Sequence, residues 1–315
     1  MFTAVRLTWR VQRWELGFLI GGSLLLAAGV AFVAWQTAVT VARLDACHNQ
    51  TVPTLSASCV SLVQWSNVLG ALSPTLQGAT TVAPFFVGIL LGAPLVSREI
   101  EKRTAPMAWS LSLSRARWLA GRTFPLLVVI AIALLLLGQA SEALLRATPP
   151  GEVGFRQFAM HGPLIAARGI SVFCIGVLVG LLMGRVLPAI LVTGLVVIVL
   201  FIGLQLVRDG LMRAEATWVE ARASDFSGVM IYGSAFMDDA TGEVVTFDEA
   251  SSRFPDVFSP TGSGMPPGMS PVYLTTPPEL YPVFVAREIG ALALATLLVG
   301  GSALWVIGWR RPDVG

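Results

Sequence analysis

The residues with the greatest capacity for chemistry in this chain are charged, and many of them gather in residues 97–122. This block holds the only lysine of the 315 residues, Lys102. A phosphate-binding P-loop needs a lysine at the end of the pattern Gly-x-x-x-x-Gly-Lys-Ser/Thr. Ile100 and Glu101 precede Lys102 and Arg103 follows it, so the sequence contains no P-loop.

Motifs of membrane enzymes and ion-coupled transporters are also missing from the sequence. Its two histidines, His48 and His161, lie far apart, and neither His-Glu-x-x-His nor Gly-x-Ser-x-Gly occurs. A membrane hydrolase needs a nucleophile or metal set at hydrocarbon depth, and ion-coupled transporters usually carry carboxylates or histidines near the midplane. The sequence therefore predicts no catalytic residue, metal site or cofactor in this chain.

Membrane helices must position these charges. The composition is 55% hydrophobic and 13% charged, and mean hydropathy is +0.74, which is typical of integral membrane proteins. Apolar runs of about 17–25 residues can cross the hydrocarbon core as helices. Six runs predict an all-α polytopic fold, with spans at residues 16–36, 78–96, 123–141, 165–183, 186–207 and 283–308.

The distribution of arginine and lysine predicts the orientation. Basic residues gather at the N-terminus, in residues 97–122 and in the last segment, 283–315, whereas the insert 208–282 is mostly acidic. Cytoplasmic loops are enriched in Arg and Lys, so both termini are expected inside and the insert outside. Residues 1–15 are expected to form an interfacial helix before the spans in 16–207; an ordinary basic flank is the alternative.

The outer segments carry two more features. Cys47 and Cys59 lie in the first outer loop and predict a disulfide, with two free thiols as the alternative. Within the insert we expect a helix over 209–222, a hairpin over 229–247 and irregular chain over 255–282. Its acidic turn, with Asp238, Asp239 and Glu243, lacks the spacing of a calcium loop, which favours a solvated turn.

A few polar residues and glycines fall within or beside the spans. Arg168 could be an intramembrane functional charge, but a later helix start or a side chain that extends outward is favoured. Glu142, Arg287 and Glu288 are expected at outer span ends, near water. Glycines at four-residue spacing predict close helix packing: Gly176, Gly180 and Gly184, and more weakly Gly17 with Gly21 and Gly88 with Gly92.

A bundle without energy-converting residues needs an energy source in another subunit, and 97–122 is the only cytoplasmic segment long enough to dock one. Two of its stretches are Arg98-Glu99-x-Glu101-x-x-Thr104 and Ser114-Arg115-x-x-Trp118-Leu119-x-Gly121-Arg122. They resemble the corresponding pattern in permease subunits of bacterial type-2 ABC exporters. Two further segments resemble the same permeases more weakly. They are Gly180-x-x-x-Gly184-Arg185-x-x-Pro188-Ala189 and the basic tail after Trp309. Arg103 and Leu113 depart from the family pattern, which often has Gly and Pro at these positions.

The resemblance implies that two permeases pair, as a homo- or heterodimer, and that each rests on an ABC ATPase that binds ATP and Mg²⁺. A coupling helix, placed in residues 104–115, would pass ATPase closure to the spans. Glu99 and Glu101 would meet basic groups on the ATPase, and Arg103, Arg115 and Arg117 would meet acidic groups or lipid phosphates. For each charge, a solvated loop residue or a positive-inside signal is the alternative. Charge reversal at the two glutamates is expected to leave the bundle intact. The implied coupling residues are Glu99, Glu101, Arg103, Thr104, Ser114 and Arg115.

The resemblance also implies that the second and fifth spans face the dimer axis. The substrate path would then include Thr81, Phe85, Phe86, Thr193, Val197, Phe201 and Gln205, with ordinary packing as the alternative for each. Their apolar character indicates a hydrophobic or amphipathic cargo.

The predicted function is that of a permease subunit in a bacterial plasma membrane that exports this cargo with energy from a separate ATPase. Its predicted partners are that ATPase, a second permease copy and membrane lipid, and no nucleic acid. A non-transporting partner or sensor on the same scaffold, or a membrane-embedded enzyme, is the alternative. A neighbouring gene with a P-loop and an ABC signature would favour the exporter.

Overall fold

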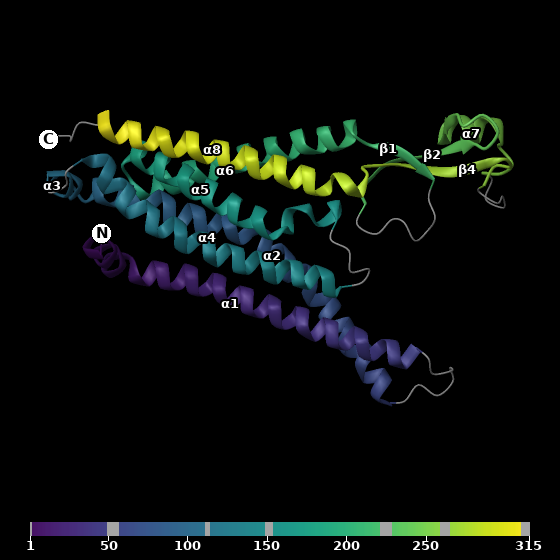
Figure 1. Cartoon of the computed structure of the whole chain (residues 1–315), viewed down its shortest axis with the longest axis horizontal. Coiled ribbons are helices and arrows are strands. Elements are labelled where there is room, and N and C mark those ends of the chain that lie inside the picture. Colours follow the sequence, from purple (N-terminus) through teal and green to yellow (C-terminus); the bar gives the residue numbers. More distant parts are fainter. Residues whose placement is uncertain are drawn as a thin grey trace. The chain divides into compact units, whose positions relative to one another are not determined.

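The computed structural model describes residues 2–48, 57–110, 114–148, 154–220, 229–258 and 265–309 (Figure 1). It divides into two compact units. The first comprises Met1–Gly151, Ala159–Phe201 and Val285–Gly315, and the second comprises Glu152–Phe158 and Ile202–Phe284.

The described residues contain six helices that are long and apolar enough to span a membrane, as predicted. Hydropathy located the spans but underestimated the helices, because polar turns extend several of them. In α2, for example, the hydroxyls of Ser66 and Ser73 donate to the carbonyl oxygens of Val63 and Leu69, so these hydroxyls need no hydrogen bond to water. The six helices are α1 (Phe2–His48), α2 (Ala57–Glu101), α4 (Arg115–Ala147), α5 (Gly162–Met183), α6 (Val186–Ala214) and α8 (Tyr281–Trp309).

Helix α5 forms the centre of the first unit and is mostly buried. It packs closely against α2 and α4, and α1 packs on α4 and α2 (Figure 1). Phe173, Leu134 and Leu137 are fully buried in the core between these helices. The remaining large helices, α6 and α8, expose many apolar side chains in this single chain.

Glycines bring α5 and α2 together, as the four-residue spacing predicted. A Cβ atom at Gly176 would lie 2.8 Å from the amide nitrogen of Ala93, and one at Gly180 would overlap the carbonyl oxygen of Ala93. Gly88 and Gly92 supply the facing surface on α2, where a Cβ would overlap Val172 and Phe173. Three other glycines do not fit the prediction: Gly184 ends α5 in a left-handed conformation (φ 66°), and Gly17 and Gly21 have open space beside them.

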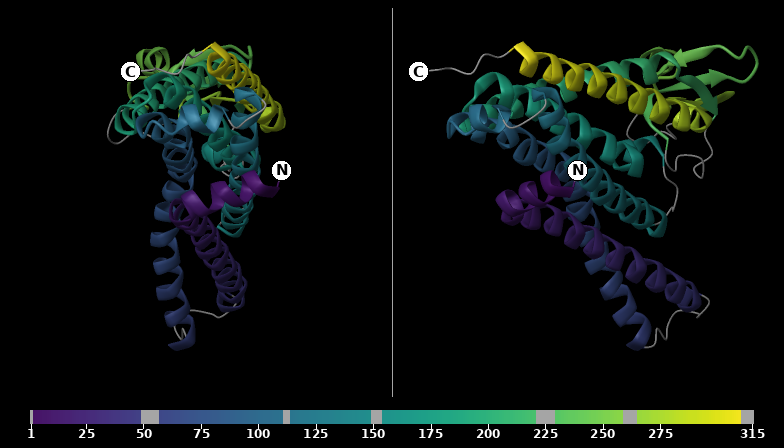
Figure 2. Two further views of the ribbon diagram at one scale, coloured as in Figure 1. Left: turned by 90° about the vertical axis from the view of Figure 1, so that its left-hand side faces the viewer. Right: turned by 60° about the vertical axis from the view of Figure 1, so that its left-hand side comes forward.

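The predicted disulfide joins the first two long helices. Cys47, near the end of α1, is bonded to Cys59, near the start of α2, with their Cα atoms 6.1 Å apart. Figure 2 shows α1 in purple and the start of α2 in blue converging at this end. The predicted interfacial helix 1–15 continues into α1 without a break, and its side chains lie outside the described ones.

The second unit is built on a four-stranded antiparallel sheet in the order β1-β4-β2-β3. The strands are β1 (Thr217–Glu220), β2 (Ile231–Asp238), β3 (Val244–Thr246) and β4 (Met269–Thr275). The short helix α7 (Phe247–Arg253) buries Ala250 against Phe236 and Val245. Two short 3-10 helices, η1 (Phe155–Met160) and η2 (Pro278–Leu280), complete the described elements apart from α3.

The hairpin predicted over 229–247 is confirmed by the pairing of β2 with β3. Its turn is solvated, and the Asp238 carboxylate accepts hydrogen bonds from the amides of Ala240 and Thr241. The helix predicted over 209–222 is right only to Ala214, because β1 follows. The irregular chain predicted over 255–282 is wrong at β4, whose Val-Tyr-Leu core pairs with both β1 and β2 despite the surrounding prolines.

Candidate functional site

The predicted coupling segment, residues 97–122, is mostly helical. Its first residues form the last turn of α2, and the chain then turns sharply at Lys102 and Arg103. The amide of Thr104 closes this turn by donating to the carbonyl oxygen of Glu99 over 3.0 Å. Arg103 adopts a left-handed conformation (φ 58°), which glycine adopts at no steric cost.

A short helix, α3 (Ala105–Ser110), lies inside the range predicted for the coupling helix. Ala105 and Trp109 are buried on one side of it. The indole of Trp109 packs edge-on against Trp118 of α4, with ring centroids 6.2 Å apart, and the Arg115 guanidinium lies over the Trp109 ring. Met107, by contrast, is 71% exposed. Helix α3 is therefore anchored to α4 and presents an apolar side chain outward.

The two glutamates of the segment tie α2 to other helices. Glu99 forms an ion pair with Arg122 of α4, and both side chains are largely buried. Glu101 accepts a hydrogen bond of 2.8 Å from the amide of Val186, the first residue of α6. Such a carboxylate satisfies an amide that has no partner within its helix and suits the positive end of the helix dipole.

These contacts correct one expectation. Reversing the charge of Glu99 and Glu101 would break links within the chain, so it would not test docking cleanly. The other predicted coupling residues have structural roles or are exposed. The Ser114 side chain caps α4 by accepting from the amide of Arg117 over 3.2 Å. Lys102, Arg103 and Thr104 are exposed, and Arg115 is half-buried.

The predicted substrate-path residues divide into two groups. Thr193 and Val197 are buried within the chain, and Phe85 packs edge-on against Phe201 with ring centroids 4.8 Å apart. Their placement matches the packing role that the sequence left open. Thr81 is half-buried, whereas Phe86 and Gln205 are exposed. Of the seven residues, Phe86 is the large apolar side chain that remains available to a ligand or a second chain.

Buried charges near the other end of the first unit were located incorrectly from the sequence. Glu142 and Glu288 were expected near water but are 7% and 5% exposed. The Arg168 residue is 6% exposed and lies inside a helix that begins at Gly162. The two alternatives offered for it, a later helix start and a side chain that extends outward, are therefore both wrong. Its guanidinium donates to Glu288 Oε1 over 3.0 Å and to the carbonyl oxygen of Ala159 over 3.1 Å.

A second polar cluster lies beside the start of α5. Glu142 accepts from the amide of Gly162 over 2.8 Å, and His161 Nδ1 lies 2.9 Å from the same carboxylate. A weaker contact joins Glu142 to Arg146 over 3.3 Å. The sequence did contain a signal for such clusters, because opposite charges within separate apolar runs are expected to pair.

A family model described as "ABC-2 membrane transporter related" matches residues 21–208, more than half of the chain. The match includes the coupling segment and the first five spans. No curated protein and no solved structure matches the chain.

Proposed function

The chain belongs to the ABC-2 membrane transporter related family, and from this membership we propose that it is the permease subunit of an ATP-driven exporter. It is a multi-pass membrane protein and a permease-like membrane component, a class that associates with an ABC ATPase. In the proposed complex, the separate ATPase binds ATP and Mg²⁺, and two permease copies form the pathway. Both termini face the cytoplasm of a bacterium, and the insert lies outside.

The observation that best supports this proposal is how the coupling segment is attached. Helix α3 packs on α4 through Trp109 and Trp118, Glu99 joins α2 to α4, and Glu101 joins α2 to α6. A force applied to α3 therefore reaches α4 directly, and reaches α2 and α6 through a chain of contacts. Met107 and the exposed turn at Lys102 and Arg103 offer a partner an apolar side chain beside two cations.

The surfaces that the spans leave exposed support a proposal for the cargo. Phe86 on α2 is 59% exposed, and α6 exposes a series of leucine, isoleucine and valine side chains. Such walls bind hydrocarbon and repel ions, which favours a hydrophobic or amphipathic cargo. The direction of transport, outward, follows from the resemblance to exporters.

The test uses the full chain in nanodiscs, alone and with the ABC ATPase encoded beside it. We expect no ATP hydrolysis by the chain alone and stimulated hydrolysis in the complex. A Met107→Asp variant should lower both ATPase copurification and stimulation, because a carboxylate replaces an apolar contact at the proposed interface. Met265→Asp, at an exposed methionine of the insert, is the matched control.

Two results would contradict the proposal. One is robust hydrolysis by the isolated chain. The other is equal partner binding and equal stimulation for Met107→Asp, Met265→Asp and the unchanged protein, which would remove α3 from the interface.

A further inference from the structure

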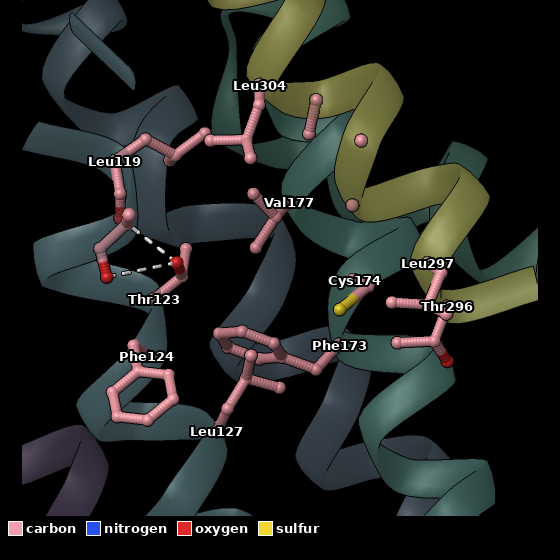
Figure 3. A pocket seen from close by; sticks show the side chains of 14 residues that line it. Leu119, Thr123, Phe124, Leu127, Phe173, Cys174, Val177, Thr296, Leu297 and Leu304 are labelled. Atoms are coloured by element: carbon pink, nitrogen blue, oxygen red, sulfur yellow. Dashed lines mark hydrogen bonds between the residues drawn. The ribbon is translucent and has the colours of Figure 1, made fainter. Parts of the chain in front are cut away.

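A cavity of about 420 Å³ lies between α4, α5 and α8, inside the first unit (Figure 3). Leu119, Phe124 and Leu127 form its wall on α4, Phe173 and Val177 its wall on α5, and Leu297 and Leu304 belong to its wall on α8. All three helices are candidate membrane spans. The fluid that meets this cavity is therefore lipid.

The cavity walls are almost entirely apolar, and both threonine hydroxyls that line it donate within their own helices. The Thr123 hydroxyl donates to the carbonyl oxygen of Leu119 over 3.0 Å, as Figure 3 shows. The Thr296 hydroxyl donates to the carbonyl oxygen of Leu292 over 2.7 Å. An apolar space of this size is unfavourable for water. The occupant must contact the walls with hydrocarbon.

Much of this space exists because α8 carries two consecutive glycines here. Both Gly300 and Gly301 line the cavity, and a Cβ atom added to either would meet nothing within 4 Å. A larger side chain at these positions can therefore fill the cavity without displacing another helix. This property separates occupancy of the cavity from folding of the bundle.

A cation lies in line with the cavity, at the start of α4. Three arginines occupy the first turns of this helix: Arg122 pairs with Glu99, and Arg115 lies over Trp109. Arg117 is exposed and has no ion pair among the described residues. It is three residues before Ala120 and seven before Phe124, so it shares their face of α4, one turn beyond the cavity wall.

We propose that this cavity binds one acyl chain of an anionic phospholipid, whose phosphate group is bound by Arg117. The lipid comes from the leaflet at which α4 begins and α8 ends. The exposed indoles of Trp305 and Trp309 on α8 are suited to the same headgroup region. This inference requires only that α4, α5 and α8 cross a membrane, so it stands apart from the proposed transport function.

The test uses the full chain in vesicles that contain phosphatidylglycerol or phosphatidylcholine with the same photoreactive acyl chain. We expect labelling to map to residues 119–127 and 296–304. A Gly300→Leu variant should lower this labelling about tenfold, since the leucine occupies the acyl-chain space. Gly290→Leu is the control, because Gly290 lies on α8 in open space outside the cavity.

The headgroup contact is tested with Arg117→Gln. This change should reduce the preference for phosphatidylglycerol about fivefold, the ratio that corresponds to the gain of about 1 kcal/mol per cation near an anionic leaflet. Lys102→Gln removes a nearby exposed cation outside the cavity and should change the preference less.

Three outcomes would overturn the proposal. Equal labelling of the unchanged protein and Gly300→Leu would identify ordinary surrounding lipid. If Gly300→Leu loses self-association while its labelling is unchanged, the cavity binds a second copy of the chain and not a lipid. An unchanged preference for phosphatidylglycerol in Arg117→Gln would show that Arg117 does not bind the phosphate group. If Gly300→Leu does not fold, Gly301→Leu decides the question in the same way.

Discussion

At the scale of single residues, Arg103 shows how a departure from a family pattern can be explained physically. Its φ of 58° lies in the region that favours glycine. The Thr104 amide and the Glu99 carbonyl oxygen fix this turn from both sides. The sequence identified Arg103 as an unusual residue for this position. Its left-handed backbone conformation could be recognised only from the structure of the turn.

This geometry predicts that Arg103→Gly stabilises the chain. Relief of a left-handed conformation in a residue with a side chain is worth about 1 kcal/mol in the free energy of unfolding. Unfolding in detergent measures it, with Lys102→Gly as the neighbouring control. A variant that is destabilised as much as the control would contradict the prediction. If Arg103 also contacts an ATPase, partner binding should weaken while stability rises.

At the scale of helices, contact of backbone with backbone holds α2 against α5. Gly92 and Gly180 are the positions where a side chain would overlap a carbonyl oxygen of the opposing helix. The four-residue spacing predicted this face of α5, because glycines four apart share one side of a helix. The partner helix could not be predicted, since the same spacing also occurs in α1, where no described atom lies within 4 Å of a Cβ at Gly17 or Gly21.

A methyl group should be enough to disturb this contact. We expect Gly180→Ala to lower the free energy of unfolding by about 1–3 kcal/mol, the usual cost of overpacking. Gly290→Ala introduces the same methyl group on α8, where nothing lies within 4 Å, and should be neutral or mildly stabilising. Similar stability for both variants would show that α2 and α5 can move apart without cost.

The limits of prediction are equally clear at this scale. Spans were predictable because long apolar runs have few other stable structures in a membrane. Strand β4 was not, because Pro271 within it and the prolines and glycines around it masked a short β-forming run that pairs on both sides. In the coupling segment, the position of α3 was predictable. The partners of Glu99 and Glu101 were not, because Arg122 and Val186 reach them only through the fold.

At the scale of the whole molecule, polar contacts connect the last helix to the centre of the bundle. Arg168 of α5 meets Glu288 of α8 across 120 residues of sequence. One turn along, the Ser171 hydroxyl lies 2.8 Å from that of Thr296. Many side chains of α8 are exposed, so these few contacts account for much of its attachment.

Removal of one partner of this ion pair should therefore be costly. Glu288→Leu leaves the Arg168 charge buried without its carboxylate, and we expect a loss of about 3–5 kcal/mol in the free energy of unfolding. The double change Arg168→Met with Glu288→Leu should recover most of this loss. The exposed pair Arg253 and Glu249 supplies the control cycle, with an expected coupling below about 1 kcal/mol. If the loss in the double variant equals the sum of the losses in Glu288→Leu and Arg168→Met, the pair is not coupled.

The Cys47–Cys59 bond gives the molecule a covalent pivot. It fixes the end of α1 to the start of α2, so these two helix ends can neither separate nor slide past each other. Helix α2 has 45 residues and contains Pro74, Pro84 and Pro94, each a place where a helix can bend. A movement imposed on the end of α2 beside α3 would be transmitted along a helix that can bend at these prolines. At the other end the disulfide prevents translation, so the movement would arrive there as a rotation.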